Sequence, residues 1–133
     1  NLGQALQFLS RVHKRRSVVF LISDFQAEDS RSPLAVSNHR HDLVAITVSD
    51  PRERALPDVG FLTFRDAETG EIVEVDTRHP RVRTLFAESA DRRQEALSDG
   101  LRRVGVDELA VSTTEPYATS LRRFFASRER RQR

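Results

Sequence analysis

The apolar residues at the start of the chain change from helical spacing to strand spacing near residue 17. Leu2, Leu6 and Leu9 recur at intervals of three and four, which predicts an amphipathic helix over residues 2–14. Residues 18–22 (VVFLI) are then all apolar, with no alternation. A strand needs this pattern when both of its faces are covered, and such strands are typical of parallel sheets. We therefore expect a buried parallel strand over residues 17–23.

A short helix and a second apolar strand follow. Asp29 and Ser30 are residue types that cap helices, and they predict a helix ending near residue 38, with Pro33 tolerated in its first turn. Residues 43–48 (LVAITV) form the second buried strand. Strand, helix and strand within about thirty residues predict a βαβ unit with a right-handed crossover.

The middle of the chain changes to a period of two. Leu62 and Phe64, and later Val73 and Val75, alternate with polar residues on either side of a turn that ends at Gly70. This alternation is typical of antiparallel strands with one face exposed. We expect a β-hairpin inserted over about residues 61–76.

The last third returns to helical spacing. Pro80 opens a long predicted helix, and Gly105 follows it as a left-handed residue that ends helices. Residues 108–112 read as a short strand, and Thr113 or Thr114 then caps a final helix. The order of elements predicts a single α/β domain over residues 1–133. It is a Rossmann-like three-layer αβα sandwich with a mostly parallel sheet and the inserted antiparallel hairpin.

Charge argues against a nucleic-acid partner. The 133 residues include 22 Lys and Arg against 20 Asp and Glu, a formal net charge of +2. A nucleic-acid footprint concentrates positive charge on one face, whereas here both signs are interleaved. Only residues 128–133 form a basic block, and a solvated chain end explains that block better than phosphate contacts.

Missing residue types narrow the chemistry. The chain has no Cys, so disulfides, thiolate zinc sites and thiol nucleophiles are excluded. No apolar run approaches the roughly 18 residues of a membrane helix, so we expect no membrane segment in this piece and a cytoplasmic location. There is no Met, even at position 1, which suggests an excised piece of a longer protein.

Hydroxyl and carboxylate side chains follow each predicted parallel strand. Ligands in open α/β sheets collect beyond the carboxyl ends of the strands. The candidate residues there are Ser23, Asp24, Asp50, Thr113 and Thr114. Their oxygen atoms suit a hard divalent cation such as magnesium or manganese. The same residue types also cap helices and begin turns; the two readings stay open for Asp24, and a turn is favoured for Asp50.

His39 and His41 are the other candidate metal ligands. Two histidines two residues apart near a helix end point in different directions, so they make a poor ligand pair. Positive charge is favoured at a helix C-terminus. The pattern therefore favours a helix-terminal cap.

Six segments together resemble a bacterial family. They are residues 17–25 (SVVFLISDF), 41–46 (HDLVAI), 50–53 (DPRE), 56–60 (LPDVG), 66–70 (DAETG) and 117–125 (YATSLRRFF). The family is catalogued as domain of unknown function 58 and is related to von Willebrand factor A domains. The resemblance implies a von Willebrand A-like fold, of which this chain would be the C-terminal portion.

The resemblance also implies a cation site and a partner. Domains of this kind hold a divalent cation with an Asp-x-Ser-x-Ser motif, a Thr and an Asp after the fourth strand; Asp24 occupies the position of that Asp, and the other ligands would precede residue 1. Family members are commonly encoded beside MoxR-type AAA+ ATPases, which implies such an ATPase as a protein partner. Many relatives carry N-terminal membrane helices, so the parent protein could be membrane-anchored.

Two functions from different classes remain. The first is a non-catalytic protein-interaction module that binds a MoxR-type AAA+ ATPase and carries an incomplete cation site. The second is a metal-dependent phosphoester hydrolase that uses Asp24 and Asp50 as ligands. It needs a third ligand and a base, and none converges on these residues in the sequence. We favour the first, and we also expect the isolated chain to self-associate through an exposed sheet edge.

Overall fold

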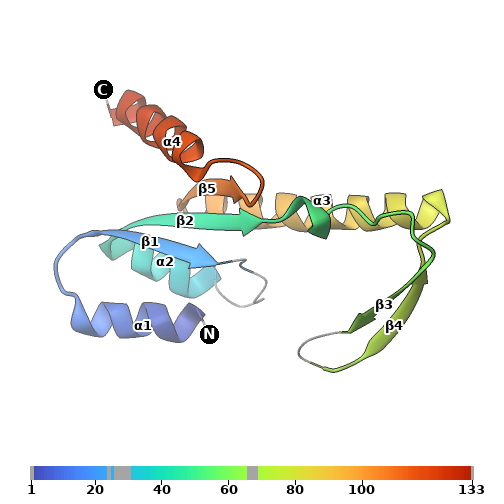
Figure 1. The fold of residues 1–133 in the computed structure, drawn as a ribbon. Coiled ribbons are helices and arrows are strands. Elements are labelled where there is room, and N and C mark those ends of the chain that lie inside the picture. Colours follow the sequence, from blue (N-terminus) through green and yellow to red (C-terminus); the bar gives the residue numbers. More distant parts are fainter. Residues whose placement is uncertain (1, 24, 26–30, 66–68, 133) are drawn as a thin grey trace. The chain divides into compact units, whose positions relative to one another are not determined.

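The computed structural model describes residues 2–23, 25, 31–65 and 69–132 (Figure 1). Its elements are α1 (Leu2–Val12), β1 (Val18–Ser23), α2 (Arg31–Arg40), β2 (Asp42–Ser49), the 3-10 helix Pro51–Glu53, β3 (Phe61–Arg65), β4 (Ile72–Asp76), α3 (Pro80–Arg103), β5 (Asp107–Ser112) and α4 (Tyr117–Gln132). The predicted α/β class with a mostly parallel sheet and one antiparallel pair is confirmed. The predicted caps Asp29 and Ser30 lie outside the described residues.

The chain divides into two compact units. One consists of residues 1–50 together with 95–133, and the other of residues 51–94. The predicted single domain is not tested by this division and stays a prediction. None of the described helices has the length and apolar content that crossing a lipid bilayer requires.

The first unit is built on a three-stranded parallel sheet in the order β1-β2-β5. Val18 pairs with Asp42 at the start of β1, and Val44 pairs with Asp107 at the start of β5. The middle strand, β2, is the most buried of the three, because it has a neighbour on each side and helices over both faces. This is the βαβ arrangement that the sequence predicts.

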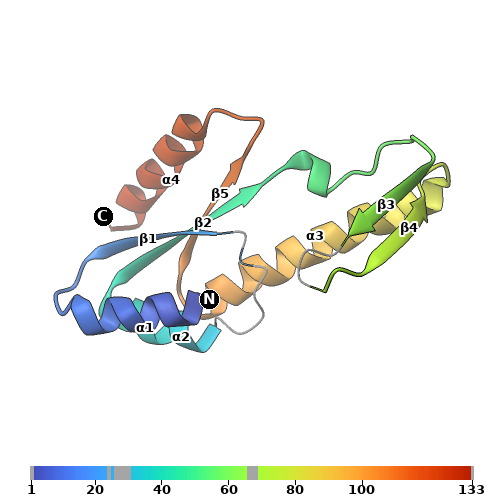
Figure 2. The ribbon, with the colours of Figure 1, turned by 60° about the horizontal axis from the view of Figure 1, so that its bottom comes forward.

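Helices cover both faces of this sheet (Figure 2). On one face Leu6 of α1, Leu34 of α2 and Leu101 near the end of α3 pack on Leu43 and Ala45 in a single core cluster. On the other face Phe124 of α4 packs on Val44 and Leu109. The three layers expected from the sequence are therefore present in this unit.

The edge strand β1 differs from the prediction on one of its faces. Its apolar run predicts cover on both sides, and Val19 and Leu21 do pack against the α1–α2 layer. The alternate residues Val18, Phe20 and Ile22 are exposed. From α4, the ring of Phe125 meets the ring of Phe20 edge to face, with 6.2 Å between the ring centroids.

The second unit holds the predicted hairpin. β3 and β4 pair antiparallel, with Leu62 opposite Val75 and Phe64 opposite Val73. The ring of Phe64 stacks on Phe86 of α3 with 6.4 Å between centroids. Gly70 has a φ of +74°, a left-handed conformation that glycine adopts readily in a turn. The stacked rings of Phe64 and Phe86 thus join the hairpin to the first half of α3.

Candidate functional site

The candidate residues at the carboxyl ends of the strands lie in one unit. Ser23 ends β1, Asp50 follows β2, and Thr113 and Thr114 follow β5. The backbone N–H of Thr113 donates to the carbonyl of Ser49 at 3.0 Å, so the ends of β2 and β5 are held side by side. The sequence-based expectation that these residues share an edge therefore agrees with the strand topology.

Local turns use the hydroxyl groups at this edge. Ser23 Oγ accepts a hydrogen bond from the N–H of Phe25 at 3.0 Å. Ser112 Oγ lies 2.9 Å from Thr114 Oγ1 and accepts from the Thr114 N–H at 3.3 Å. The prediction that Thr113 or Thr114 caps the last helix is wrong, because α4 begins at Tyr117 and Thr114 bonds to Ser112 instead. Hydroxyls of Ser and Thr form such turns readily.

Phe25 is an unusual residue at this edge. Its φ is +53°, in the left-handed region that bulky side chains rarely adopt. The side chain is nevertheless buried, and it belongs to the core cluster with Leu6 and Leu34. Core packing and the hydrogen bond to Ser23 Oγ therefore hold Phe25 in this conformation.

The predicted cation site is only partly covered by the described residues. Among the described residues, no three His, Cys, Asp or Glu side chains gather closely enough to hold a metal ion. Ser23 and Asp50 have further interactions of their own. Asp24 lies outside the described residues, so its predicted role as a ligand stays a prediction.

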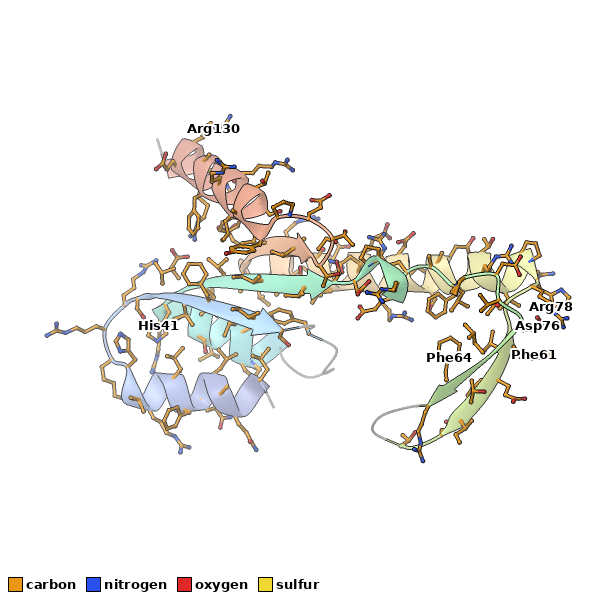
Figure 3. The ribbon with its side chains drawn as sticks, viewed as in Figure 1. His41, Phe61, Phe64, Asp76, Arg78 and Arg130 are labelled. Carbon is orange, nitrogen blue, oxygen red and sulfur yellow. The ribbon has the colours of Figure 1, made fainter. Side chains whose placement is uncertain are left out.

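The histidine pair separates in the structure. His39 lies in the last turn of α2, where a helix cap was expected. His41 follows the last residue of that helix, its backbone N–H donates to the carbonyl of Ser37 at 2.9 Å, and its side chain is buried (Figure 3). Its Nδ1 is 3.3 Å from Ser17 Oγ, and its ring centroid is 6.1 Å from that of His13. We assign His41 a packing role between α1 and β2.

Comparison with known proteins decides the family. The model of the family described as "Protein of unknown function DUF58" matches residues 1–96. The chain belongs to this family. No solved structure was found to match this DUF58 chain.

Its curated relatives are mycobacterial. It is 34% identical over 131 residues to the uncharacterized protein Rv1480 of Mycobacterium tuberculosis and to Mb1516 of Mycobacterium bovis, and these matches cover 98% of the chain. The chain spans only 41% of the length of these two relatives. The uncharacterized protein MAV169 of Mycobacterium avium is matched at 34% identity over 77% of its length.

A charged cluster at the base of the DUF58 hairpin was missed by sequence reasoning. The guanidinium of Arg78 donates to both carboxylate oxygens of Asp76, at 2.9 Å from Nε and 2.8 Å from Nη2. The same guanidinium lies 5.1 Å from the ring centroid of Phe61. Figure 3 labels the side chains of Phe61, Asp76 and Arg78. Hydrogen bonds from Arg78 lower the pKa of Asp76 from 3.8 to about 2.

We expect the Asp76–Arg78 pair to make hairpin stability depend on pH below 4. A carboxyl group with a lowered pKa stabilises the folded state above its unfolded-state value, and this contribution is lost as the pH falls through the folded value. Chemical unfolding of the wild type and Asp76→Asn should therefore differ most above about pH 4 and converge near pH 2. In an Arg78→Gln background the same substitution should lose this pH dependence. Parallel stability curves for wild type and Asp76→Asn would contradict the assignment.

Proposed function

We propose that the chain is a non-catalytic protein-interaction module and that its partner is a MoxR-type AAA+ ATPase. The observation that carries the proposal is the apolar surface of the hairpin unit. Phe61 and Ile72 lie at opposite ends of one hairpin face and are both exposed. Several large apolar side chains exposed on one element favour a protein-binding surface.

The hairpin exposes apolar groups on its other face as well. Phe64 and Val73 form a direct cross-strand pair on the side of Phe86, and both remain exposed despite the stacked ring. The guanidinium of Arg78 lies over the ring of Phe61, so the exposed ring stands beside the Asp76–Arg78 pair. An exposed aromatic residue beside a charged pair is a suitable anchor for a partner.

A non-catalytic role is supported by the arrangement of the candidate residues. Ser23, Ser112 and Thr114 use their hydroxyls in local turns. A hydrolase would need a base directed at a nucleophile or a bound metal. We propose that Asp24 adds one ligand to a magnesium or manganese site completed by residues outside this chain, and that the cation supports partner binding rather than turnover.

Partner binding should depend on the exposed hairpin residues. In calorimetric titrations with the MoxR-type ATPase of the same organism, Phe61→Ser and Ile72→Lys should each weaken binding at least about tenfold, because each removes or charges an exposed apolar contact. Ile22→Lys, the same substitution at an exposed position on β1 of the other unit, serves as the matched control and should bind as the wild type does. An ATPase that fails to bind the wild type, with and without magnesium, overturns the proposal.

The hydrolase alternative has a direct test. Wild type and Asp50→Asn are assayed against a generic phosphoester with magnesium and with manganese. Our proposal expects no turnover by either protein. Metal-dependent turnover that is lost in Asp50→Asn would replace the interaction module with the enzyme.

A further inference from the structure

A groove lies between α1 and α2 in the first unit. The two helices pack side by side, and both end where β1 and β2 begin (Figure 1). The groove has a volume of about 430 Å³. Each wall is a row of residues three or four positions apart, from α1 and the turn after it on one side and from α2 on the other: Gln7, Arg11 and Lys14, and Pro33, Val36 and Arg40.

This groove opens away from the edge of the sheet. On the opposite side of α1, Ala5, Phe8 and Val12 are directed toward β1. Gln7 and Arg11 line the groove from the side that faces α2. The groove therefore does not depend on which strands pair with β1.

Three cationic side chains gather at one end of the groove. Arg11, Lys14 and Arg40 line it and are exposed. Within the part of the chain that the structure describes, none of the three forms an ion pair, and no Asp or Glu lines the groove. Lys14 Nζ donates to the carbonyl of Ser10 at 3.2 Å, which leaves two further N–H groups to a ligand. This end of the groove therefore favours a negatively charged ligand.

The middle of the groove is apolar. Val36 lies one turn before Arg40 on α2, and 59% of its surface is exposed. Pro33 precedes Val36 by one turn, and the buried Leu6 of α1 also lines the groove. An apolar surface thus adjoins the three cations.

We propose that this groove binds a segment of a partner protein in which an apolar side chain lies beside carboxylates. The apolar group packs on Pro33 and Val36, and the carboxylates pair with Arg11 and Arg40, whose guanidinium groups suit bidentate contacts. Amphipathic protein segments dock between helices in this way, and complementary charge fixes their register. A nucleic-acid backbone could use the cations, but its phosphates offer no apolar group to Val36. The combination therefore favours a protein ligand.

Charge reversal in the groove tests this proposal. A short fluorescent peptide of leucine and glutamate is titrated with the chain, and its anisotropy reports binding. The wild type should bind saturably, and Arg40→Glu should weaken binding at least about tenfold, because it directs a carboxylate at the carboxylates of the peptide. Arg122→Glu makes the same charge change at an exposed position of α4, on the other face of the sheet, and should bind as the wild type does. Equal losses in both variants, or no binding by the wild type, overturn the proposal.

Matched ligands separate the groove from general attraction and from misfolding. Arg40→Glu should gain affinity for a peptide of leucine and lysine, whereas a variant that fails to fold would bind neither peptide. Val36→Ser should weaken binding of the leucine–glutamate peptide, because it removes the apolar contact. A DNA duplex that displaces this peptide from the wild type and binds Val36→Ser equally well would assign the groove to phosphate groups and overturn the proposal.

The groove is independent of the proposed ATPase site on the hairpin. Ile72→Lys, which should weaken ATPase binding, should bind the leucine–glutamate peptide as the wild type does. Loss of peptide binding in Ile72→Lys would place the peptide on the hairpin and overturn the groove proposal. Failure of the ATPase titration leaves the peptide result unchanged, so the two proposals fail separately.

Discussion

Replacing Arg128 by Met should lower the free energy of unfolding by about 2 kcal/mol. Arg128 Nη2 lies 2.6 Å and 2.8 Å from the two carboxylate oxygens of Asp42, and its Nε lies 3.1 Å from Asp107. These contacts join α4 to the first residues of β2 and β5. The side chains are 16%, 32% and 29% exposed for Arg128, Asp42 and Asp107. Partly buried carboxylates that lose their partner are costly, and solvent reduces that cost from the fully buried case.

Arg131 supplies the control for this prediction. It contacts Asp107 at 3.2 Å, but its side chain is exposed. Arg131→Met should change the free energy of unfolding by less than about 0.5 kcal/mol. Urea unfolding followed by circular dichroism measures both variants. Equal effects of the two substitutions would show that burial of the Arg128 contacts contributes nothing.

Arg128 shows where sequence patterns stop being informative. The basic run at residues 128–133 predicts a solvated chain end, and this prediction is wrong for its first residue. α4 continues to Gln132, and it carries Arg128 over two carboxylates that are 86 and 21 positions away along the chain. The spacing of apolar residues predicts which side chains share a face of one helix or strand. It does not predict ion pairs between residues that are far apart in the sequence and meet only when the sheet has formed.

The same distinction explains how the rest of the fold was predicted. β2 and the hairpin strands were predicted from short runs of apolar or alternating residues. At most of their ends, the observed bound differs from the expected one by one residue. The apolar run of β1 correctly predicts a strand. The described residues cover the face of Val19 and Leu21 and leave the other face exposed, so the expected cover on both faces is not found among them.

The sequence predicts where the candidate residues lie in the fold, but not what their side chains contact. Topology places Ser23, Asp50 and Thr113 at one edge of the sheet, because parallel strands end together. What each side chain does there depends on hydrogen bonds over two or three residues, as at Ser23 and Phe25. The residue type alone does not show whether such a side chain forms a turn or binds a ligand. The charged cluster of Asp76 and Arg78 had no motif to indicate it.

Replacing Asn38 by Ala should lower the free energy of unfolding by about 3 kcal/mol. Asn38 lies near the end of α2, and its Oδ1 accepts from the N–H of Leu43 at 3.0 Å. Its Nδ2 donates to the carbonyls of Gly105 at 2.8 Å and Val104 at 3.3 Å. One amide therefore satisfies backbone groups from β2 and from the turn that follows α3. Removing it leaves the N–H of the buried Leu43 without its acceptor, and an unsatisfied buried group costs about 1–3 kcal/mol.

Asn38→Asp separates the two halves of this contact. The carboxylate keeps an acceptor for the Leu43 N–H, but it places negative charge against the carbonyl oxygens of Val104 and Gly105. Asn38→Asp should therefore be destabilised at neutral pH and recover part of its stability as acid protonates the carboxyl group. Asn38→Ala should show no such recovery relative to the wild type. Urea titrations at pH 7 and pH 4 measure both variants. If Asn38→Ala costs less than about 1 kcal/mol, water replaces the hydrogen bonds of the amide, and the core packing that includes Leu34 and Leu43 then holds α2 to β2.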